Sequence, residues 1–240
     1  MHCPVCHTLA ARSWPVEKTE QDAQVFYWIA ECHACGAMFD HRCENVDQEA
    51  DKEAQALVNY EFYKPAFSDD EYEKLLAINK GMIEHFARFA QDTSRYVEIG
   101  VGLGFLTRAA GSKFDRVFGL DLEVDTALQV GPVPDNVEFV VHGEYLQQET
   151  APISALCAWH VVEHLPDPLS VLVPLFRQMP SGSIFFGQIP LYRPEHVFAA
   201  HFVFHNERSL GSMTRAYGFH PLYFERDEIN QFLSFCFRRS

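Results

Sequence analysis

The strongest constraint on the fold is a glycine-rich turn at residues 100–104, with the sequence GVGLG. Residues 96–99 before it have the pattern of a buried parallel strand, and residues 105–110 after it the pattern of a starting helix. Because glycine has no side chain, a ligand can lie directly against the backbone of such a turn. A second strand ends at Asp121, where a carboxylate can accept hydrogen bonds from both ribose hydroxyls of a nucleoside. Together these features predict a site for a ribose-bearing cofactor.

The spacing of the glycines and the acid in front of them indicate which cofactor binds. A nicotinamide site requires the pattern G-x-G-x-x-G, but here Phe105 stands where its third glycine would be. Glu98, two residues before the turn, would repel a pyrophosphate and would suit a ligand that has an ammonium group and no phosphate. S-adenosylmethionine has this chemistry. The alternative is an ordinary strand, turn and helix that bind nothing.

Several motifs in order along the chain resemble those of class I S-adenosylmethionine-dependent methyltransferases. They are EIGVGLG at 98–104, GLD at 119–121, AWHVVEHLPDP at 158–168, HFVF at 201–204, SL at 209–210 and GF at 218–219. The element EHLPDP is similar to the branch that contains the ubiquinone-pathway and sugar methyltransferases. The resemblance covers roughly residues 60 to 240. It implies an α/β fold with a Rossmann-like, mostly parallel sheet whose last strand is antiparallel, and an S-adenosylmethionine-dependent methyltransferase of EC class 2.1.1.

The expected cofactor contacts come partly from the residues and partly from this resemblance. They are Glu98, Gly100, Gly102, Gly104, Phe105, Asp121, Leu122, Glu144, Trp159 and Tyr63. Leu122 is expected to press on the adenine face, and the resemblance places Glu144 at the adenine amino group, although Glu144 is also compatible with a solvated loop acid. An aromatic segment at this place often covers the cofactor in the resembling family, so Tyr60 or Tyr63 is a candidate active-site residue. Simple packing between domains is the alternative for both tyrosines.

A candidate base lies where the fourth expected strand ends. A sulfonium methyl is already activated, so the protein mainly aligns the acceptor and excludes water. An alcohol acceptor also loses a proton, which calls for a base tuned near neutral pH. His164 is the first candidate for this base, with Glu163 orienting it or binding substrate. Alternatively, Asp167 caps a helix with Pro168 in its first turn, and His164 only packs against that entry.

The histidine-rich segment that follows the fifth strand is a second source of site residues. The resembling family places a substrate-covering insertion here, and His201 is a second catalytic candidate. The spacing of Glu195, His196 and His201 matches no metal-ligand signature, so we expect no catalytic metal from these three. Specificity for the acceptor resides in residues 190–210, which the sequence describes poorly.

Two C-x-x-C knuckles occupy the N-terminus. Cys3, Cys6, Cys32 and Cys35 have a spacing that suits tetrahedral zinc, and residues 25–29 between the pairs indicate a ribbon strand. Four cysteines close the coordination sphere, so the predicted zinc ribbon is structural. Iron in a rubredoxin-like site and free thiols are the alternatives.

The chain divides into three expected parts: a zinc ribbon at 1–45, a helical linker and cap at 46–92, and a Rossmann-like methyltransferase domain at 93–240. Within the second part, Ser68 and Glu71 form a capping box ahead of an amphipathic helix. The expected strands of the third part after the glycine turn are 116–121, 137–141, 153–159, 183–189, 222–226 and 232–238, of which the last two form a closing hairpin.

Composition narrows the function further. The formal net charge of −14 opposes a nucleic-acid surface, which needs clustered Lys and Arg. No apolar run approaches a membrane span and no signal-like core opens the chain, so a cytoplasmic location is the default expectation. We expect a small-molecule acceptor, a sugar or another hydroxylated metabolite, and no membrane or nucleic-acid partner. The alternatives are methylation of ribosomal or transfer RNA and a non-catalytic cofactor-binding scaffold. The sequence leaves the oligomeric state open.

Overall fold

The structure is a computed structural model that describes residues 1–20, 23–44, 67–148 and 150–240. The helix expected from residue 46 onwards and the tyrosines at positions 60 and 63 lie outside the described residues. No helix within the described ranges has the length and apolar character needed to traverse a lipid bilayer.

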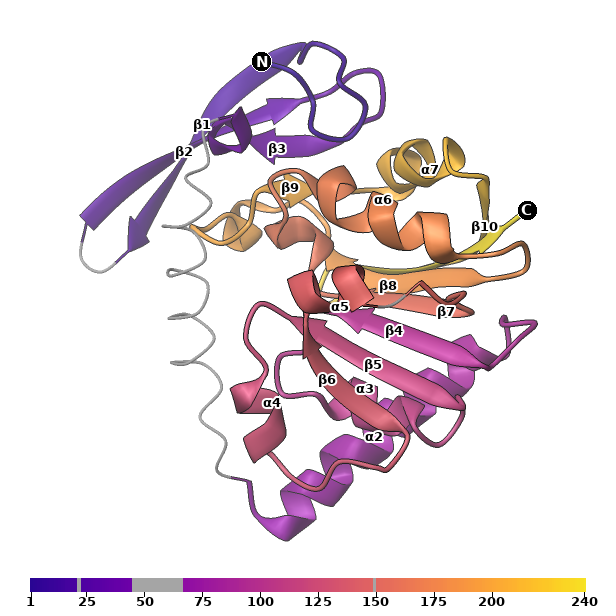
Figure 1. Cartoon of the computed structure of the whole chain (residues 1–240). Helices are drawn as coiled ribbons and strands as arrows, with labels where there is room; N and C mark the ends of the chain where they lie inside the picture. Colours follow the sequence, from indigo (N-terminus) through magenta and orange to yellow (C-terminus); the bar gives the residue numbers. More distant parts are fainter. Residues whose placement is uncertain (21–22, 45–66, 149) are drawn as a thin grey trace.

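The main body is a seven-stranded sheet in the order β10-β11-β8-β7-β4-β5-β6 (Figure 1). Its strands are β4 (Arg95–Ile99), β5 (Arg116–Asp121), β6 (Val137–Val141), β7 (Ala155–Trp159), β8 (Ile184–Pro190), β10 (Phe219–Asp227) and β11 (Phe232–Arg239). Neighbouring strands from β6 across to β8 run parallel, while β11 is antiparallel to β8 and β10 is antiparallel to β11. This arrangement confirms the predicted fold class, a Rossmann-like, mostly parallel sheet that an antiparallel hairpin closes.

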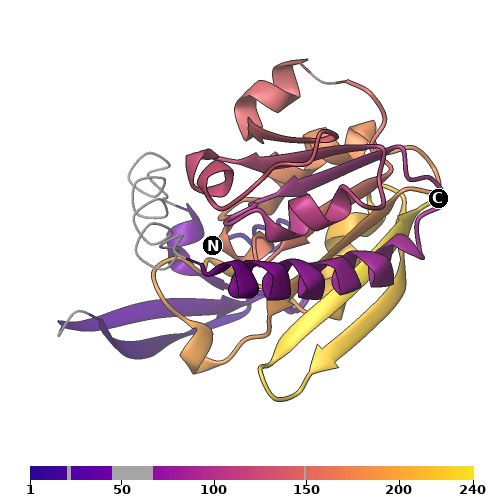
Figure 2. The same ribbon diagram turned by 90° about the horizontal axis from the view of Figure 1, so that it is seen from below.

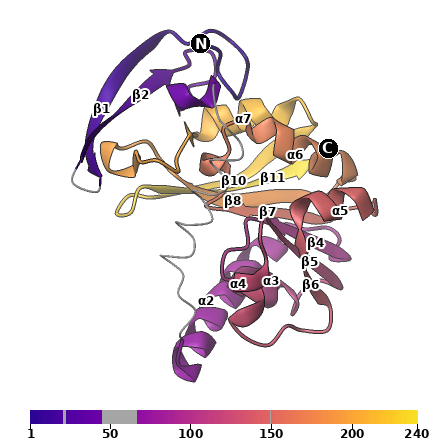
Figure 3. The same ribbon diagram turned by 60° about the vertical axis from the view of Figure 1, so that its left-hand side comes forward.

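Helices cover both faces of this sheet. The helices are α2 (Asp69–Ala87), α3 (Phe105–Ala110), α4 (Asp125–Gln129), α5 (His142–Gln148), α6 (Pro168–Gln178) and α7 (Glu207–Arg215). The long helix α2 crosses one face beside α3 (Figure 2), and α6 and α7 lie on the other face (Figure 3). Two large clusters of buried apolar side chains follow these two faces, so the sheet separates two cores.

Helix α2 begins where the capping signal predicts. The Ser68 side chain accepts a hydrogen bond from the N–H of Glu71, and the Glu71 carboxylate accepts one from the N–H of Ser68. This reciprocal pair satisfies two backbone donors that a helix start otherwise leaves unpaired. On the buried face, Phe86 stacks on Phe186 of β8 with ring centroids 4.6 Å apart, which fixes α2 against the sheet.

The N-terminal residues form a second, four-stranded antiparallel sheet in the order β1-β2-β3-β9. Its strands are β1 (Arg12–Glu20), β2 (Ala23–Glu31), β3 (Met38–Asp40) and β9 (Val203–Phe204), so its last strand comes from the far end of the chain. Figures 1 and 3 show the strands β1 and β2 of this sheet above the helices α6 and α7. Buried Cys3, Ala30 and Phe39 belong to the same apolar cluster as Leu210 of α7, so the N-terminal sheet packs directly on the main body.

The strand order places the crevice of the main sheet between β4 and β7. From β4 the chain proceeds outward through β5 and β6, and it then returns to β7 and proceeds the other way to β8. In open α/β sheets a ligand binds outside the carboxyl ends of the strands where this direction reverses. The glycine turn follows β4 and the HVVEH segment follows β7, so both flank this point.

Candidate active site

A cavity of about 410 Å³ opens at the carboxyl ends of β4, β5 and β7. This volume falls within the range of about 300–1,000 Å³ that is typical of small-molecule sites. Its lining residues include Asn79, Glu98, Gly100, Gly102, Gly104, Phe105, Asp121, Leu122, His142, Trp159, His160, His164 and Ala200. The cavity thus brings together the glycine turn, the acid that ends β5 and the segment that follows β7.

The three glycines of the turn serve different purposes. All three have positive φ angles, but a Cβ on Gly100 would lie 2.2 Å from a methyl of Val161, and one on Gly104 would lie 2.6 Å from the Phe139 ring. These two positions therefore require glycine because protein atoms pack against them. A Cβ on Gly102 would meet no atom within 4 Å, since this residue faces the open cavity with φ of +51°. Gly102 is the position of the turn where a ligand can approach the backbone.

Asp121 ends β5 at the cavity wall, as its place in the sequence predicts. One carboxylate oxygen accepts a hydrogen bond from the N–H of Gly102 at 3.2 Å, and the other accepts one from the N–H of Leu122 at 2.7 Å. Burial raises the pKa of Asp121, although these backbone hydrogen bonds oppose the rise. The carboxylate is thus fixed in orientation, and each oxygen keeps a further lone pair for a ligand hydroxyl.

Glu98 lines the same cavity but is 2% exposed. Its carboxyl accepts hydrogen bonds from Thr107 Oγ1 at 2.6 Å and from the Tyr96 hydroxyl at 3.3 Å. Burial raises the pKa of Glu98 to about 8, so the unligated protein holds this acid mostly protonated at neutral pH. The ionised form that would attract an ammonium group has to be generated when a cation arrives.

Arg108 stabilises the glycine turn from beneath and was not predicted from the sequence. It is 3% exposed, and its guanidinium donates to five backbone carbonyls, those of Leu103, Gly104, Ala127, Gly131 and Pro132. These bonds tie the turn to α4 and the loop that follows it. No sequence pattern indicates this role, because an arginine in a helix ordinarily faces water.

A histidine and a glutamate form an ion pair where β7 ends. His160 has a positive φ of +53°, a conformation that is uncommon for residues other than glycine, asparagine or aspartate. Its Nδ1 lies 3.3 Å from a Glu163 oxygen, and its Nε2 lies 2.9 Å from Gln188 Oε1, so both ring nitrogens donate. Burial alone would lower the pKa of His160, but the hydrogen bond and charge of Glu163 raise it overall. The wall of the cavity therefore contains a histidine held between two acceptors, which the sequence analysis did not single out.

The three predicted catalytic residues lie together. Glu163 is 1% exposed, and although burial alone would raise its pKa, the hydrogen bond from His160 and the nearby histidines lower it overall. The rings of His164 and His201 lie 4.8 Å apart. Burial, with His164 next to it, lowers the pKa of His201 to about 4, which keeps this imidazole neutral. Of the three, His164 lines the cavity, and the other two lie behind it.

The local geometry of residues 164–168 is compatible with both hypotheses for His164, that of a base and that of a residue that packs against the start of α6. Asp167 caps α6 by accepting from the N–H of Ser170 at 3.3 Å, and Pro168 occupies the first turn, as expected. His164 Nδ1 lies 2.8 Å from the carbonyl oxygen of Ala200 and donates to it, which anchors the ring to the histidine-rich segment. The neutral ring then has its lone pair on Nε2. His164 is thus packed and also exposed to the cavity.

The remaining predicted cofactor residues differ in position. Phe105, Leu122 and Trp159 line the cavity, whereas the side chain of Glu144 is exposed and does not. The residue of α5 that does line it is His142, two positions earlier. Helix α5 starts directly after β6, and this turns Glu144 towards solvent. The roles of these residues in binding remain predictions.

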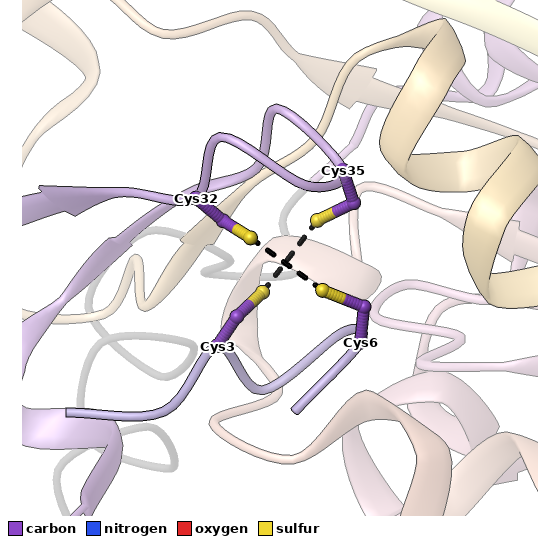
Figure 4. Close-up of side chains that lie close together, drawn as sticks. All are labelled: Cys3, Cys6, Cys32 and Cys35. Atoms are coloured by element: carbon purple, nitrogen blue, oxygen red, sulfur yellow. Dashed lines mark hydrogen bonds between the residues drawn. The ribbon is translucent and has the colours of Figure 1, made fainter. Parts of the chain in front are cut away.

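The four N-terminal cysteines converge (Figure 4). The Sγ atoms of Cys3 and Cys35 lie 3.6 Å apart, and those of Cys6 and Cys32 lie 3.5 Å apart. Four sulfurs at about 2.3 Å from a tetrahedral zinc ion would lie about 3.8 Å from one another. A hydrogen bond from the Cys35 thiol is the largest of the effects that lower the pKa of Cys3 to about 5. The donor set, the spacing and a stabilised thiolate all fit zinc.

The sheet order defines a Rossmann-like architecture with a cavity at the carboxyl ends of its strands, and comparison with known proteins identifies its class. A family model described as "Methyltransferase domain" matches residues 69–231. No curated protein matches the chain in sequence. The chain belongs to this methyltransferase domain family and is a methyltransferase of EC class 2.1.1.

Several solved structures that are distant in sequence have the same fold. The Burkholderia thailandensis 1,6-didemethyltoxoflavin-N1-methyltransferase, with bound 1,6-didemethyltoxoflavin and S-adenosylhomocysteine, is 16% identical, with a TM-score of 0.59 over 89% of this chain and 96% of that one. Magnesium protoporphyrin IX methyltransferase from Synechocystis PCC 6803, with bound S-adenosylhomocysteine, is 11% identical, with a TM-score of 0.58 over 81% and 100%. An amino pentose methyltransferase from Micromonospora echinaspora, with bound S-adenosylmethionine, is 13% identical, with a TM-score of 0.53 over 69% and 92%. These likenesses show the class I methyltransferase fold.

Proposed function

We propose that the chain transfers a methyl group from S-adenosylmethionine to a hydroxyl group of a small molecule, a sugar or another hydroxylated metabolite. The observation that carries this proposal is the single cavity that has Gly102 and Asp121 at one end and His164 at the other. At one end, a carboxylate that can accept hydrogen bonds from ribose hydroxyls lies beside a backbone without a side chain. At the other end, an imidazole can take a proton. Similar structures contain S-adenosylmethionine or its demethylated product, which supports the choice of cofactor.

The residues of the turn would bind this cofactor. Asp121 would accept hydrogen bonds from the ribose hydroxyls, and Gly102 would give the room for close approach. Glu98, once ionised, would face the ammonium group of the methionine moiety. The apolar side chains of Phe105 and Leu122 would flank the adenine and exclude water. When bound, S-adenosylmethionine supplies an electrophilic methyl group on a sulfonium.

The other end of the cavity would prepare the acceptor. A hydroxyl group has to lose its proton as its oxygen is methylated, and His164 Nε2 would take that proton. Buried Glu163 has a ligand atom within 4.8 Å of a nitrogen of this ring and would help to orient it. The alternative role of His164, that of packing alone, predicts no such effect of protonation on rate.

The N-terminal sheet would hold a structural zinc ion through Cys3, Cys6, Cys32 and Cys35. This ion would fix the loops that precede β1 and β3, because two of its four ligands come from each loop. The proposed division of the chain is a zinc ribbon at 1–45, a linker and cap at 46–92, and the methyltransferase domain at 93–240.

A transfer assay separates this function from its alternatives. The zinc-loaded protein is incubated with S-adenosylmethionine that has a labelled methyl group, in parallel with sugar nucleotides, a small-metabolite extract and purified ribosomal and transfer RNA. The proposal expects label in the sugar or metabolite fraction. Label in RNA alone would show nucleic-acid methylation, which the net charge of −14 opposes. Binding of S-adenosylhomocysteine without any transfer would favour a scaffold.

A further inference from the structure

Glu163, His164 and His201 form a cluster whose arrangement is not explained by the role of His164 as a base alone. One carboxylate oxygen and one ring nitrogen from each histidine all lie within 4.8 Å of one another. Two imidazoles and one carboxylate are a ligand set that binds divalent transition-metal ions and leaves further coordination positions open. Glu163 and His164 come from the short 3-10 helix after β7, whereas His201 comes from the segment before β9, so the tertiary structure assembles the set.

The two histidine rings are oriented as metal ligands are. His164 Nδ1 donates to the carbonyl oxygen of Ala200 at 2.8 Å, and His201 Nδ1 donates to the carbonyl oxygen of His196 at 2.7 Å. In metal sites the second ring nitrogen characteristically donates to a backbone carbonyl or a carboxylate, which fixes the tautomer that has its lone pair on the other nitrogen. In each ring Nδ1 therefore carries the proton, and in the neutral form Nε2 carries the lone pair.

Glu163 supplies an independent indication. Its Oε1 is paired with His160, but its Oε2 is buried and has no hydrogen-bond partner within the described residues. A buried carboxylate oxygen without a partner costs free energy, so such an atom calls for an explanation. A cation among the three side chains would satisfy this oxygen and would also explain why the site keeps an ionised acid 1% exposed.

We propose that Glu163, His164 and His201 bind a divalent transition-metal ion at the acceptor end of the cavity. The mixed nitrogen and oxygen set suits Mn²⁺, Fe²⁺ or Zn²⁺ and differs from the soft thiolate set of the N-terminal sheet. Ligands about 2.1 Å from one ion lie at most about 4.2 Å apart, so any pair of these atoms that is farther apart has to approach as the ion enters.

The consequence for methyl transfer rests on the proposed function. Because His164 lines the cavity, an ion bound to it has its open positions towards the acceptor. A hydroxyl group that coordinates the ion has a lowered pKa and releases its proton to water. Its oxygen then forms the bond to the methyl carbon while the carbon–sulfur bond breaks and the electron pair stays on sulfur. In the loaded protein His164 would be a ligand and no longer the base, because the ion would lower the pKa of the hydroxyl group and water would take the proton.

The test measures binding of Mn²⁺ to zinc-loaded protein by electron paramagnetic resonance, because the four-cysteine set favours softer ions. The variants are Glu163→Gln, which keeps the shape of the side chain, and His201→Gln. The matched control is His196→Gln, because this histidine lies in the same segment as His201 and its ring donates to the Leu191 carbonyl instead. Unfolding midpoints and binding of S-adenosylhomocysteine are measured on every variant.

We expect one bound Mn²⁺ per chain, an affinity at least about tenfold lower in both cluster variants, and no change in the control. Absence of Mn²⁺ binding at millimolar concentration, or equal binding in all four proteins, overturns the inference. The two binding measurements test different proposals. If S-adenosylhomocysteine binds and Mn²⁺ does not, the proposed metal site is wrong and the proposed function is unaffected. If Mn²⁺ binds and S-adenosylhomocysteine does not, the proposed function is wrong and the metal site is supported. A cluster variant that does not fold leaves the other variant to decide.

Discussion

The backbone N–H of Asp40 donates a hydrogen bond of 2.8 Å to the carbonyl oxygen of Phe202. Asp40 ends β3 of the N-terminal sheet, and Phe202 directly follows the cluster residue His201. The N–H of Phe202 in turn donates to the carbonyl oxygen of Glu163 at 2.8 Å. Backbone bonds alone thus connect the cysteine-rich sheet to the acceptor end of the cavity.

Removal of the ion from the N-terminal sheet is expected to loosen this connection. Loss of zinc frees the loops that position β3, so the amide of Phe202 and the β9 amides should exchange at least several-fold faster with solvent. Hydrogen exchange of the peptide that contains residues 197–206 is compared before and after chelation, and after zinc is restored. Unchanged exchange in the chelated protein would show that β9 is held without the metal.

Replacement of Asp121 by asparagine should weaken the cofactor complex. The substitution keeps the shape but removes the charge that strengthens hydrogen bonds from ribose hydroxyls, so affinity for S-adenosylhomocysteine should fall by about tenfold or more. Calorimetric titration measures this change. Asp115→Asn is the matched control, because this aspartate is exposed at the opposite end of the same strand. Equal losses in the two variants would exclude Asp121 from the site.

Gly102→Ala tests close approach of the ligand to the turn. A Cβ at this position meets no protein atom, but it projects into the cavity and has to tolerate a φ of +51°. We expect a modest loss of stability, about 1 kcal/mol for a left-handed residue other than glycine, together with a large loss of cofactor affinity. Gly211→Ala in α7, where a Cβ also meets open space, controls for the added methyl group. Retained affinity in Gly102→Ala would mean that the ligand lies elsewhere.

The buried acid Glu98 should make stability depend on pH. Its ordinary pKa is 4.5 and its pKa in the folded protein is about 8, so the unfolded chain releases this proton at lower pH than the folded one does. The contribution of Glu98 to the free energy of unfolding is therefore full below about pH 4.5 and declines as the pH rises to about 8. Urea unfolding from about pH 5 to about pH 9 should show this decline relative to Glu98→Gln. A constant difference between the two proteins would contradict the raised pKa.

Cofactor binding should release the same proton. An ammonium group beside Glu98 stabilises the carboxylate, so binding at pH 7 should expel a proton from the wild-type protein and none from Glu98→Gln. Titrations in two buffers with different ionisation enthalpies measure the number of protons released. Equal release by both proteins would place the ammonium group away from Glu98.

Local patterns were sufficient for most elements of the methyltransferase fold. The expected strand at 116–121 has these bounds in the structure, and the helix expected to start at residue 105 does so, because a short apolar run and a glycine turn act over a few positions. Strand ends differ slightly elsewhere: the closing strand expected at 222–226 spans Phe219–Asp227, since pairing with β11 extends it. Glu163, His164 and His201 were also named from the sequence, and their catalytic role stays a prediction.

Only the tertiary structure shows which contacts the predicted site residues make. The sequence predicted the positions of Asp121 and Gly102, because both come at or just after the ends of parallel strands. It predicted the convergence of the two cysteine pairs from their C-x-x-C spacing. It could not show that β9 completes the N-terminal sheet, that Arg108 supports the glycine turn, or that Glu163 Oε2 finds no hydrogen-bond partner in the part of the chain that the structure describes. Such contacts join residues tens to hundreds of positions apart. Their formation depends on which surfaces pack together when water is excluded, and no local pattern contains that information.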